Sequence, residues 1–213
     1  MKGLKVGKPM NALGLEKRVF DVVGGSILLA VTTPVMAAVA AAIRLSDGSP
    51  VLFRQERPGL NEAPFTMYKF RTMRAPQTGQ DMYRTDELRV TTLGAFLRKT
   101  SLDELPELLN VIKGDMSLVG PRPLLVEYLP NYSPLHRRRH LVRPGITGMA
   151  QISGRRSLTF RQRLDLDIQY IEAWSPLLDL RILLKTLLVP FTTGSDESQS
   201  LDSVDDVGLM RKR

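Results

Sequence analysis

The sequence predicts an α+β, mainly helical protein that is attached to a membrane through its N-terminal region. Three features support this fold class: one uncharged apolar run near the N-terminus, two short strand-like segments of which the second alternates and is rich in aromatic residues, and later segments with helical periodicity. Of the 213 residues, 43% are hydrophobic and 24% charged, which excludes a wholly disordered chain. Since only one apolar run is long enough to enter a bilayer, a transporter with many spans is excluded as well.

The amino-acid composition excludes several kinds of functional site. Cysteine is absent, which excludes a disulfide scaffold, a thiolate zinc site, an iron–sulfur cluster and a cysteine nucleophile. The two histidines, His136 and His140, leave little room for a histidine-based metal site. The net charge of +8 favours polyanionic partners, namely nucleic acid, anionic lipid head groups or phosphorylated substrates, and composition does not choose among them.

A basic N-terminal segment, residues 1–18, precedes a membrane helix predicted over residues 19–45. Pro34 lies in the middle of the apolar run, where it bends a helix, and the hydroxyls of Thr32 and Thr33 are expected to bond the freed carbonyls. Basic residues flank both ends of the run, so the positive-inside rule favours both ends in the cytoplasm. A re-entrant helix and an ordinary kinked spanning helix both remain open; a buried soluble helix fits poorly because the run is apolar all round.

Residues 46–191 are predicted to form one cytoplasmic unit together with the membrane helix. A hairpin is expected between residues 51–53 and 65–70, with a turn at Arg57-Pro58-Gly59. Helical segments are expected over residues 89–99 (helical or extended), 106–112, 124–129, 134–141, 160–174 and 176–189. Irregular structure is expected over residues 75–86, 120–123 and 192–213, the last as a disordered tail.

Two surfaces have open interpretations. The segment 176–189 repeats leucine at helical spacing, at Leu177, Leu180, Leu184, Leu187 and Leu188. This helix either lies on a membrane surface or packs on the core. The run Arg137–Arg139 either attracts anionic lipid or is an ordinary solvated helix face.

The carboxylates Asp103 and Glu104 are adjacent in the chain. Ser101, followed three residues later by Glu104, is typical of a capping box at a helix start, which is a purely structural explanation. A chemical explanation is that a carboxylate beside phosphate-binding arginines and a divalent cation is a workable nucleophile for phosphoryl transfer. Arg98 lies just upstream, and Arg122 lies between two prolines that fix its backbone in an extended form. At a helix N-terminus Asp103 is expected to stay ionised.

Six motifs occur in a fixed order along the chain. They are Arg57-Pro58-Gly59, Lys69-Phe70-Arg71-Thr72-Met73, Ser101-Leu102-Asp103-Glu104-Leu105, Lys113-Gly114-Asp115-Met116-Ser117, Val119-Gly120-Pro121-Arg122-Pro123 and Arg143-Pro144-Gly145-Ile146-Thr147-Gly148. The ordered set resembles the bacterial sugar transferase family, the monotopic polyprenyl-phosphate phosphoglycosyl transferases. The resemblance covers about residues 15–190 and is closest to the small single-domain members, such as the bacillosamine phosphotransferase of bacterial N-glycosylation, which lack an added multi-span domain.

The resemblance implies a reaction and a set of site residues. Asp103 and Glu104 match the family's catalytic dyad. The aspartate attacks the sugar-linked phosphate of a UDP-sugar, releases UMP and forms a covalent phosphosugar–aspartate intermediate, which a membrane-embedded polyprenyl phosphate then attacks. The glutamate serves as general base or positions groups, and Mg²⁺ is the implied cofactor, held at Asp103. Phosphate- and substrate-binding roles fall on Lys69, Arg98, Arg122, Arg143, Gln151 and Arg155.

The resemblance also favours the re-entrant topology, with the kink at Thr33-Pro34 where the family has Ser-Pro. It implies a place on the cytoplasmic face of the bacterial inner membrane, in contact with membrane lipid, and leaves room for a homodimer. Met149 departs from the aromatic residue of many relatives, and the sequence assigns it no role. An N-acetylated or diacetamido sugar is somewhat favoured, with glucose and galactose left open, for the first membrane step of glycoconjugate assembly.

Two other classes of function compete with this one. A membrane-anchored nucleic-acid-binding module agrees with the charge, but no helix-turn-helix, zinc finger or aromatic-rich basic sheet is apparent in the sequence, so no nucleic acid partner is expected. A non-catalytic scaffold of a polysaccharide assembly complex is the remaining alternative. The intact Asp103, Glu104 and Arg122 speak against it.

Overall fold

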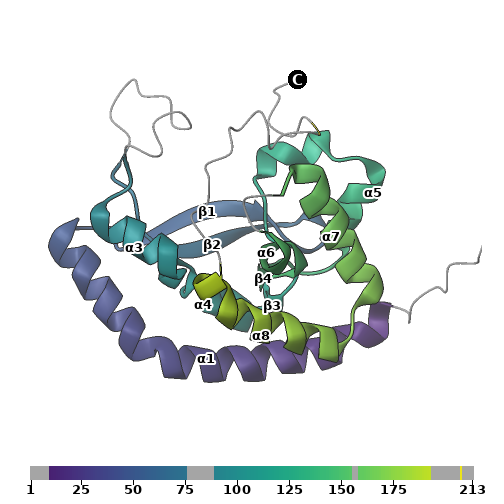
Figure 1. Cartoon of the computed structure of the whole chain (residues 1–213), viewed down its shortest axis with the longest axis horizontal. Coiled ribbons are helices and arrows are strands. Elements are labelled where there is room, and N and C mark those ends of the chain that lie inside the picture. The colour runs from purple at the N-terminus through teal and green to yellow at the C-terminus, as the bar shows by residue number, and fades with distance from the viewer. Residues whose placement is uncertain (1–9, 76–88, 155–157, 193–206, 208–213) are drawn as a thin grey trace, which may run out of the picture.

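The computed structural model describes residues 10–75, 89–154, 158–192 and 207 of the chain. Small strands and short helices form a compact body above one long N-terminal helix (Figure 1). The architecture confirms the predicted α+β, mainly helical class with one long apolar helix, a hairpin and surface helices. The predictions for residues 76–86, for residues 193–206 and 208–213 of the tail and for Arg155 lie outside the described residues.

The long helix α1 spans Met10–Ser46 and begins earlier than the predicted membrane helix. Contacts to the body explain the extra turns. Two nitrogens of Arg18 each donate over 2.6 Å to a carbonyl at the end of α4 (Glu107–Lys113), those of Val111 and Ile112. Lys17 Nζ lies 2.6 Å from a carboxylate oxygen of Asp179. Residues 10–18 of the predicted basic segment therefore belong to α1, and Lys17 and Arg18 bond this part of the helix to the body.

Pro34 lies inside α1, and the helix bends along its course (Figure 1). The hydroxyl of Thr32 donates to the carbonyl of Leu28 over 2.7 Å, and that of Thr33 donates to Leu29 over 2.6 Å. The threonines thus bond carbonyls of the turn before the proline, but the prediction that they bond the freed carbonyl is wrong, because Pro34 frees that of Ala30, four residues before it. Of the described helices, this is the one long and apolar enough to cross a membrane.

Strands β1 (Leu52–Pro58) and β2 (Pro64–Phe70) form the predicted antiparallel hairpin, in the register Leu52↔Phe70. The connection is a short 3₁₀ helix, η1 (Leu60–Glu62). Helix α3 (Thr92–Thr100) resolves the ambiguous segment 89–99 as helical, and the side chain of Thr91 caps it by accepting from the Gly94 amide.

Helix α4 ends where the sequence predicts, because Gly114 adopts a left-handed conformation with φ of 101°. A second, parallel pair of strands follows, β3 (Ser117–Val119) with β4 (Gly145–Thr147), which the sequence did not predict. The remaining elements are η2 (Leu102–Glu104), η3 (Val126–Asn131), α5 (Pro134–Arg137), η4 (Arg138–Leu141), α6 (Met149–Ser153), α7 (Phe160–Ala173) and α8 (Pro176–Thr192).

The main core joins the hairpin, α4, β3, α7 and α8. Its buried members are Phe65, Met67, Leu108, Val111, Met116, Leu118, Val119, Tyr170 and Ile182. A second cluster joins the C-terminal part of α1 to the hairpin and α3 through Val39, Ile43, Phe70 and Leu97. Both parts of α1 thus pack on one body, and burial of this apolar surface is the main term that holds them there.

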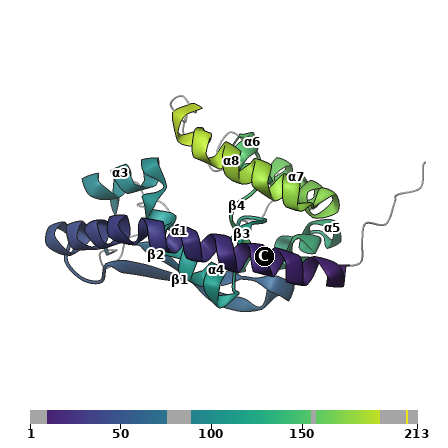
Figure 2. The same ribbon diagram turned by 90° about the horizontal axis from the view of Figure 1, so that it is seen from below.

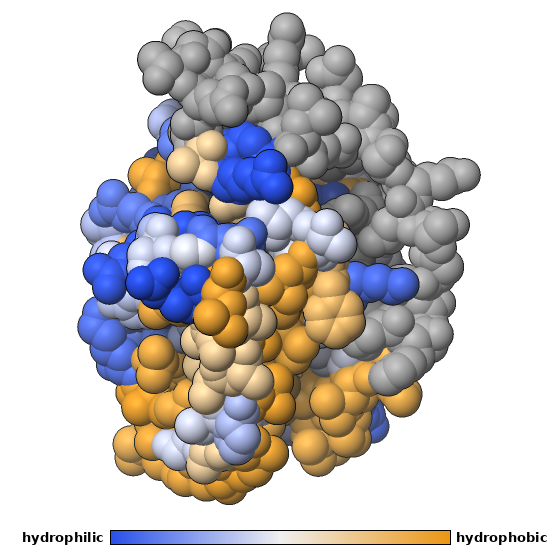
Figure 3. All heavy atoms as spheres, turned by 90° about the vertical axis from the view of Figure 1, so that its left-hand side faces the viewer, coloured by the Kyte–Doolittle hydropathy of each residue, from blue (hydrophilic) through white to orange (hydrophobic). Residues whose placement is uncertain are grey.

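Helix α8 packs on the core with one face and exposes the predicted leucines on another, so each of the two interpretations fits one face. Ile182 is fully buried in the core, whereas the five predicted leucines, from Leu177 to Leu188, are all exposed. Seen from below, α1 runs along the length of the fold and α8 starts beside its N-terminal part (Figure 2). Apolar residues gather over the lower part of the face in Figure 3, with hydrophilic residues above them. Such a contiguous apolar surface marks a site of membrane or protein contact.

The basic run Arg137–Arg139 is a solvated face for Arg137 and Arg138, whose side chains are 51% and 42% exposed, whereas Arg139 is buried and fits neither of the two predicted roles. Arg137 pairs with Glu62 at 2.8 Å, and Arg138 pairs with Glu172 at 3.0 Å. Arg139 is buried and pairs with Asp167 at 2.8 Å. The run faces α7 and η1, because the chain from α5 to η4 folds back on them, and each of its three arginines has a carboxylate partner there.

Candidate active site

The carboxylate pair lies in η2, in the reversal of the chain between α3 and α4. Ser101 adopts a left-handed conformation, with φ of 57°, and its amide bonds the last carbonyls of α3. Its side chain makes no capping hydrogen bond. The predicted capping box is therefore wrong: Ser101 ends one helix, and the strained backbone turns Asp103 and Glu104 toward the hairpin.

Glu104 is the centre of an ion-pair cluster. Lys69, from β2, places Nζ 2.6 Å from Glu104 Oε1. Arg122, from the loop after β3, donates Nη2 to the same oxygen over 2.6 Å and lies 3.5 Å from Oε2 through Nη1. Three segments distant in sequence therefore meet at one carboxylate.

A second carboxylate, Glu107, lies beside this cluster at the start of α4, 2% exposed and 3.1 Å from Lys69 Nζ. Burial, reinforced by the charge of Glu104, raises the pKa of Glu107 to about 7. Burial also works to raise the pKa of Glu104, but Arg122 and Lys69 outweigh it and hold that pKa at about 2. The two cations therefore favour the ionised form of Glu104, whereas burial favours the protonated form of Glu107.

Asp103 is half-buried, and its carboxylate has no hydrogen bond or ion pair among the described residues. Burial and the charge of Glu104 raise the pKa of Asp103 above its usual value, whereas Lys69, Arg98 and Arg122 oppose this rise. The charges of Lys69, Arg98 and Arg122 favour its carboxylate form, and the ionised state of Asp103 at neutral pH stays a prediction.

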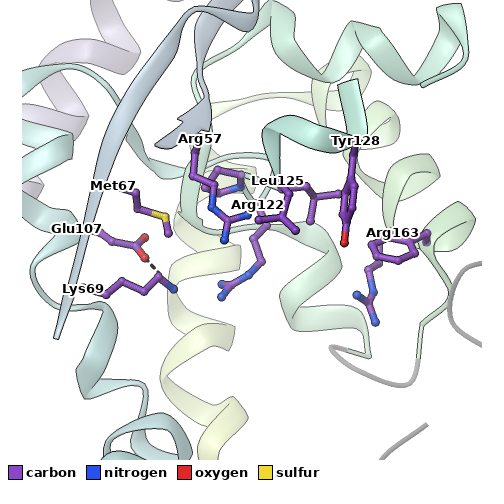
Figure 4. Close-up of a pocket in the computed structure, with 11 residues that line it drawn as sticks. Arg57, Met67, Lys69, Glu107, Arg122, Leu125, Tyr128 and Arg163 are labelled. Carbon is purple, nitrogen blue, oxygen red and sulfur yellow. Dashed lines mark ion pairs between the residues drawn. The ribbon is translucent and has the colours of Figure 1, made fainter. Parts of the chain in front are cut away.

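A cavity of about 220 Å³ adjoins the cluster. Lys69 and Arg122 line it as well as contacting Glu104, and the close-up shows Arg57 above Arg122, with Tyr128 and Arg163 on the far side from Lys69 (Figure 4). The lining is rich in cationic groups, and Glu107 supplies its one acidic side chain among the described residues. Such a cavity suits a polyanionic ligand.

The other predicted site residues differ in their surroundings. Arg98 donates Nε to the hydroxyl of Thr72 over 2.9 Å and acts electrostatically on Asp103. Arg143 instead donates Nε to the carbonyl of Gly114, at the far end of α4. Gln151 donates to the carbonyl of Ile146 over 3.4 Å. The structure brings Lys69, Arg98, Asp103, Glu104 and Arg122 together, and its contacts do not join Arg143 or Gln151 to them.

Sequence reasoning missed two residues of the site, Arg57 and Glu107. Arg57 was assigned to a turn and to the first of the six motifs without a binding role, although it lies near the end of a strand and faces the cavity (Figure 4). Glu107 follows Glu104 by three residues, a spacing that places two side chains on one side of a helix. That spacing was the signal available in the sequence.

The comparisons with known proteins agree with this geometry. The family model described as bacterial sugar transferase matches residues 12–193. The chain belongs to the bacterial sugar transferase family. The membership confirms the resemblance seen in the six motifs, and the protein is a sugar transferase.

The relatives of this sugar transferase include two of similar size. An uncharacterized sugar transferase, EpsL, of Bacillus subtilis is 50% identical over 80% of this chain and 85% of its own length. A UDP-glucose:undecaprenyl-phosphate glucose-1-phosphate transferase of Caulobacter vibrioides is 46% identical over 88% of this chain and 74% of its own. An Escherichia coli protein with the same activity in its name is 40% identical over 83% of this chain, which spans 40% of that longer relative.

Proposed function

We propose that this protein transfers a sugar 1-phosphate from a UDP-sugar to undecaprenyl phosphate, giving undecaprenyl-diphosphate-sugar and UMP. The observation that carries this proposal is Asp103, a carboxylate without a partner, beside three cations in a member of this family. The names of two relatives, which specify undecaprenyl phosphate and UDP-glucose, supply the substrates. The reaction is the first membrane step in assembling a glycoconjugate.

The proposed chemistry has two displacements. A carboxylate oxygen of Asp103 forms a bond to the sugar-linked phosphorus, and the bond from that phosphorus to the bridging oxygen breaks, so that UMP leaves with the electron pair. An oxygen of undecaprenyl phosphate then forms a bond to the same phosphorus, and the bond to Asp103 breaks, which restores the carboxylate. Lys69 and Arg122, fixed by Glu104, offer positive charge to the phosphate in both steps.

The residues present suit Mg²⁺ bound in the manner usual for phosphate substrates. Mg²⁺ keeps several waters and takes one or two carboxylates together with substrate phosphates. In the described ranges no three acidic or histidine side chains gather into a cage, whereas Asp103 offers one unpaired carboxylate. When bound, the ion neutralises charge on the phosphates.

Removal of divalent cations with EDTA is expected to lower the rate of UMP release by about 100-fold or more, because such an ion contributes several kcal/mol of charge stabilisation. Excess Mg²⁺ is expected to restore the rate. The melting temperature is expected to stay the same in EDTA, because no structural cage depends on the ion. A rate that is unchanged in EDTA would contradict the Mg²⁺ proposal.

The contacts of α1 support a re-entrant, monotopic topology. Its N-terminal part bonds α4 and α8 through Arg18 and Lys17, and its C-terminal part packs on the hairpin and α3 through Val39 and Ile43. If the two ends of α1 lay on opposite sides of a bilayer, they could not both contact one compact body on a single side. Because the flanks are basic, we assign the body to the cytoplasmic face of the inner membrane.

Two single cysteines test this topology in a chain that has none of its own. Glu16→Cys and Ser49→Cys lie at exposed positions before and after the apolar run. A membrane-impermeant maleimide added to intact spheroplasts is expected to label neither cysteine, and to label both after lysis. Labelling of one of the two in intact spheroplasts would identify a spanning helix.

The central experiment measures UMP release by the full chain with Mg²⁺, undecaprenyl phosphate and a panel of UDP-sugars. Because relatives carry the names of a glucose-1-phosphate transferase and a galactosyl transferase, UDP-glucose and UDP-galactose come first, ahead of the N-acetylated sugars that the resemblance to the small family members favoured. Release with one sugar supports the proposal and identifies the donor. No release with any sugar, from folded and membrane-inserted protein, would favour the non-catalytic scaffold.

A further inference from the structure

Arg57 is a cation of the cavity whose charge has no counter-charge among the described residues. It lies at the end of β1, and its Nη2 donates to Gln55 Oε1 over 2.6 Å. Its Nε is buried without a hydrogen-bond partner, and no carboxylate of the described residues lies within ion-pair distance. By contrast, Lys69 and Arg122 share Glu104. An unpaired, partly buried guanidinium is unfavourable unless an anion joins it.

The charges around Arg57 favour the binding of an anion. Burial, together with the like charge of Arg122, lowers the pKa of Arg57 from its ordinary value. The two guanidinium groups converge in the centre of the cavity (Figure 4). A phosphate between them relieves their repulsion and accepts from both, as guanidinium forks do with phosphate oxygens.

The far side of the same cavity is aromatic. The rings of Tyr128 and Phe160 meet edge to face, with centroids 5.7 Å apart, and the Arg163 guanidinium lies 5.3 Å from the Phe160 centroid. Aromatic and guanidinium planes are the groups on which nucleobases stack. From Lys69 to Tyr128, the cavity thus offers an ammonium group at the dyad, a pair of guanidinium groups, and an aromatic end (Figure 4).

We propose that this cavity holds the nucleotide half of the donor. Arg57, together with Arg122, binds the phosphate that leaves with the nucleoside, and the base lies against Tyr128 and Phe160. The order of groups places the sugar-linked phosphate at the end nearest Lys69 and the dyad. The inference rests on the proposed function, since it assigns part of a substrate of that reaction to Arg57, Tyr128 and Phe160, which lie outside the six predicted binding positions.

The test measures binding of UMP to the full chain in detergent by calorimetry, for wild type, Arg57→Ala and a matched control, Arg54→Ala. Arg54 lies on the same strand, is exposed, and points to the opposite face because it is three positions from Arg57, an odd number. The dissociation constant of UMP is expected to rise tenfold or more in Arg57→Ala and to change less than twofold in Arg54→Ala. The Michaelis constant for the UDP-sugar is expected to rise likewise, with that for undecaprenyl phosphate unchanged.

Two further variants separate binding from folding and phosphate from base. Arg57→Lys keeps the charge and loses the fork, so its UMP affinity is expected to fall between those of wild type and Arg57→Ala, at an unchanged melting temperature. Tyr128→Leu is expected to weaken UMP at least fivefold while leaving the affinity for inorganic pyrophosphate within twofold. If Arg57→Ala does not fold, the other two variants decide. The inference would be overturned if both Arg57→Lys and Tyr128→Leu bind UMP with the affinity of wild type.

The outcomes distinguish this inference from the proposed function. Turnover of a UDP-sugar by wild type, with unchanged UMP affinity in Arg57→Ala, overturns the inference and leaves the function standing. A rise in the Michaelis constant for undecaprenyl phosphate alone also overturns it, because Arg57 then serves the acceptor. Absence of UMP release with every UDP-sugar overturns the proposed function and this inference with it.

Discussion

An Asp103→Asn variant is expected to release UMP at a rate lower by about 10⁴-fold or more, the scale on which loss of a nucleophile acts. An amide oxygen is a far weaker nucleophile than a carboxylate, so the bond to phosphorus does not form. The fold is expected to survive, because the Asp103 carboxylate makes no hydrogen bond or ion pair among the described residues and the substitution conserves volume. The measurement is UMP release under saturating UDP-sugar and undecaprenyl phosphate.

Asp165→Asn is the matched control, since it makes the same chemical change at a half-exposed carboxylate on α7 that pairs with His136. Its rate is expected to stay within twofold of wild type. After brief incubation with donor alone, the intact mass of the wild-type protein is expected to increase by the mass of a phosphosugar. The Asp103→Asn variant is expected to show no such increase. Residual turnover of Asp103→Asn above one tenth of wild type would assign the nucleophile to another residue.

Local sequence rules predicted the elements whose signals are themselves local. The hairpin follows from alternation around a turn, and the end of α4 follows from Gly114, where a left-handed residue is needed. The same kind of rule failed at Ser101. Its spacing to Glu104 fits a helix start. However, α3 extends to Thr100, so Ser101 is the C-cap of that helix. Neighbouring elements decide which of two local interpretations applies.

The candidate site illustrates the limit of spacing arguments in another way. Lys69, Glu104 and Arg122 meet although 35 and 18 residues separate Glu104 from the other two. Only the ordered motifs, through the family resemblance, indicated that they belong together. Burial adds what motifs do not contain: it changes Glu107 from an acidic residue of a first helical turn into a buried group whose pKa is about 7.

The basic run of residues 137–139 was ambiguous in the sequence because three adjacent arginines have the same formal charge. In the structure they differ sharply: the Arg138 side chain is 42% exposed, whereas the Arg139 side chain is 2% exposed. Arg139 donates to Asp167, to the hydroxyl of Tyr132 and to the carbonyl of Arg122. It therefore fixes the backbone of a residue in the candidate site.

Replacing Arg139 with alanine is expected to destabilise the protein by about 3–5 kcal/mol, because the buried Asp167 carboxylate is left without its counter-charge. Arg138→Ala, one residue away, removes only an exposed pair with Glu172 and is expected to cost less than about 1 kcal/mol. Denaturant unfolding of both variants in the same detergent measures the difference. Equal losses of stability in the two variants would refute the structural role of Arg139.

A double variant separates the role of Arg139 in stability from its role in positioning. Arg139→Met combined with Asp167→Leu replaces the buried ion pair with apolar groups, a change that is often neutral or stabilising, so most of the lost stability is expected to return. The hydrogen bond of 2.6 Å to the carbonyl of Arg122 stays absent, however. The double variant is therefore expected to fold well and yet to turn over at least tenfold more slowly, because Arg122 is less well held against Glu104. Full recovery of both stability and turnover would show that Arg139 only supports the fold.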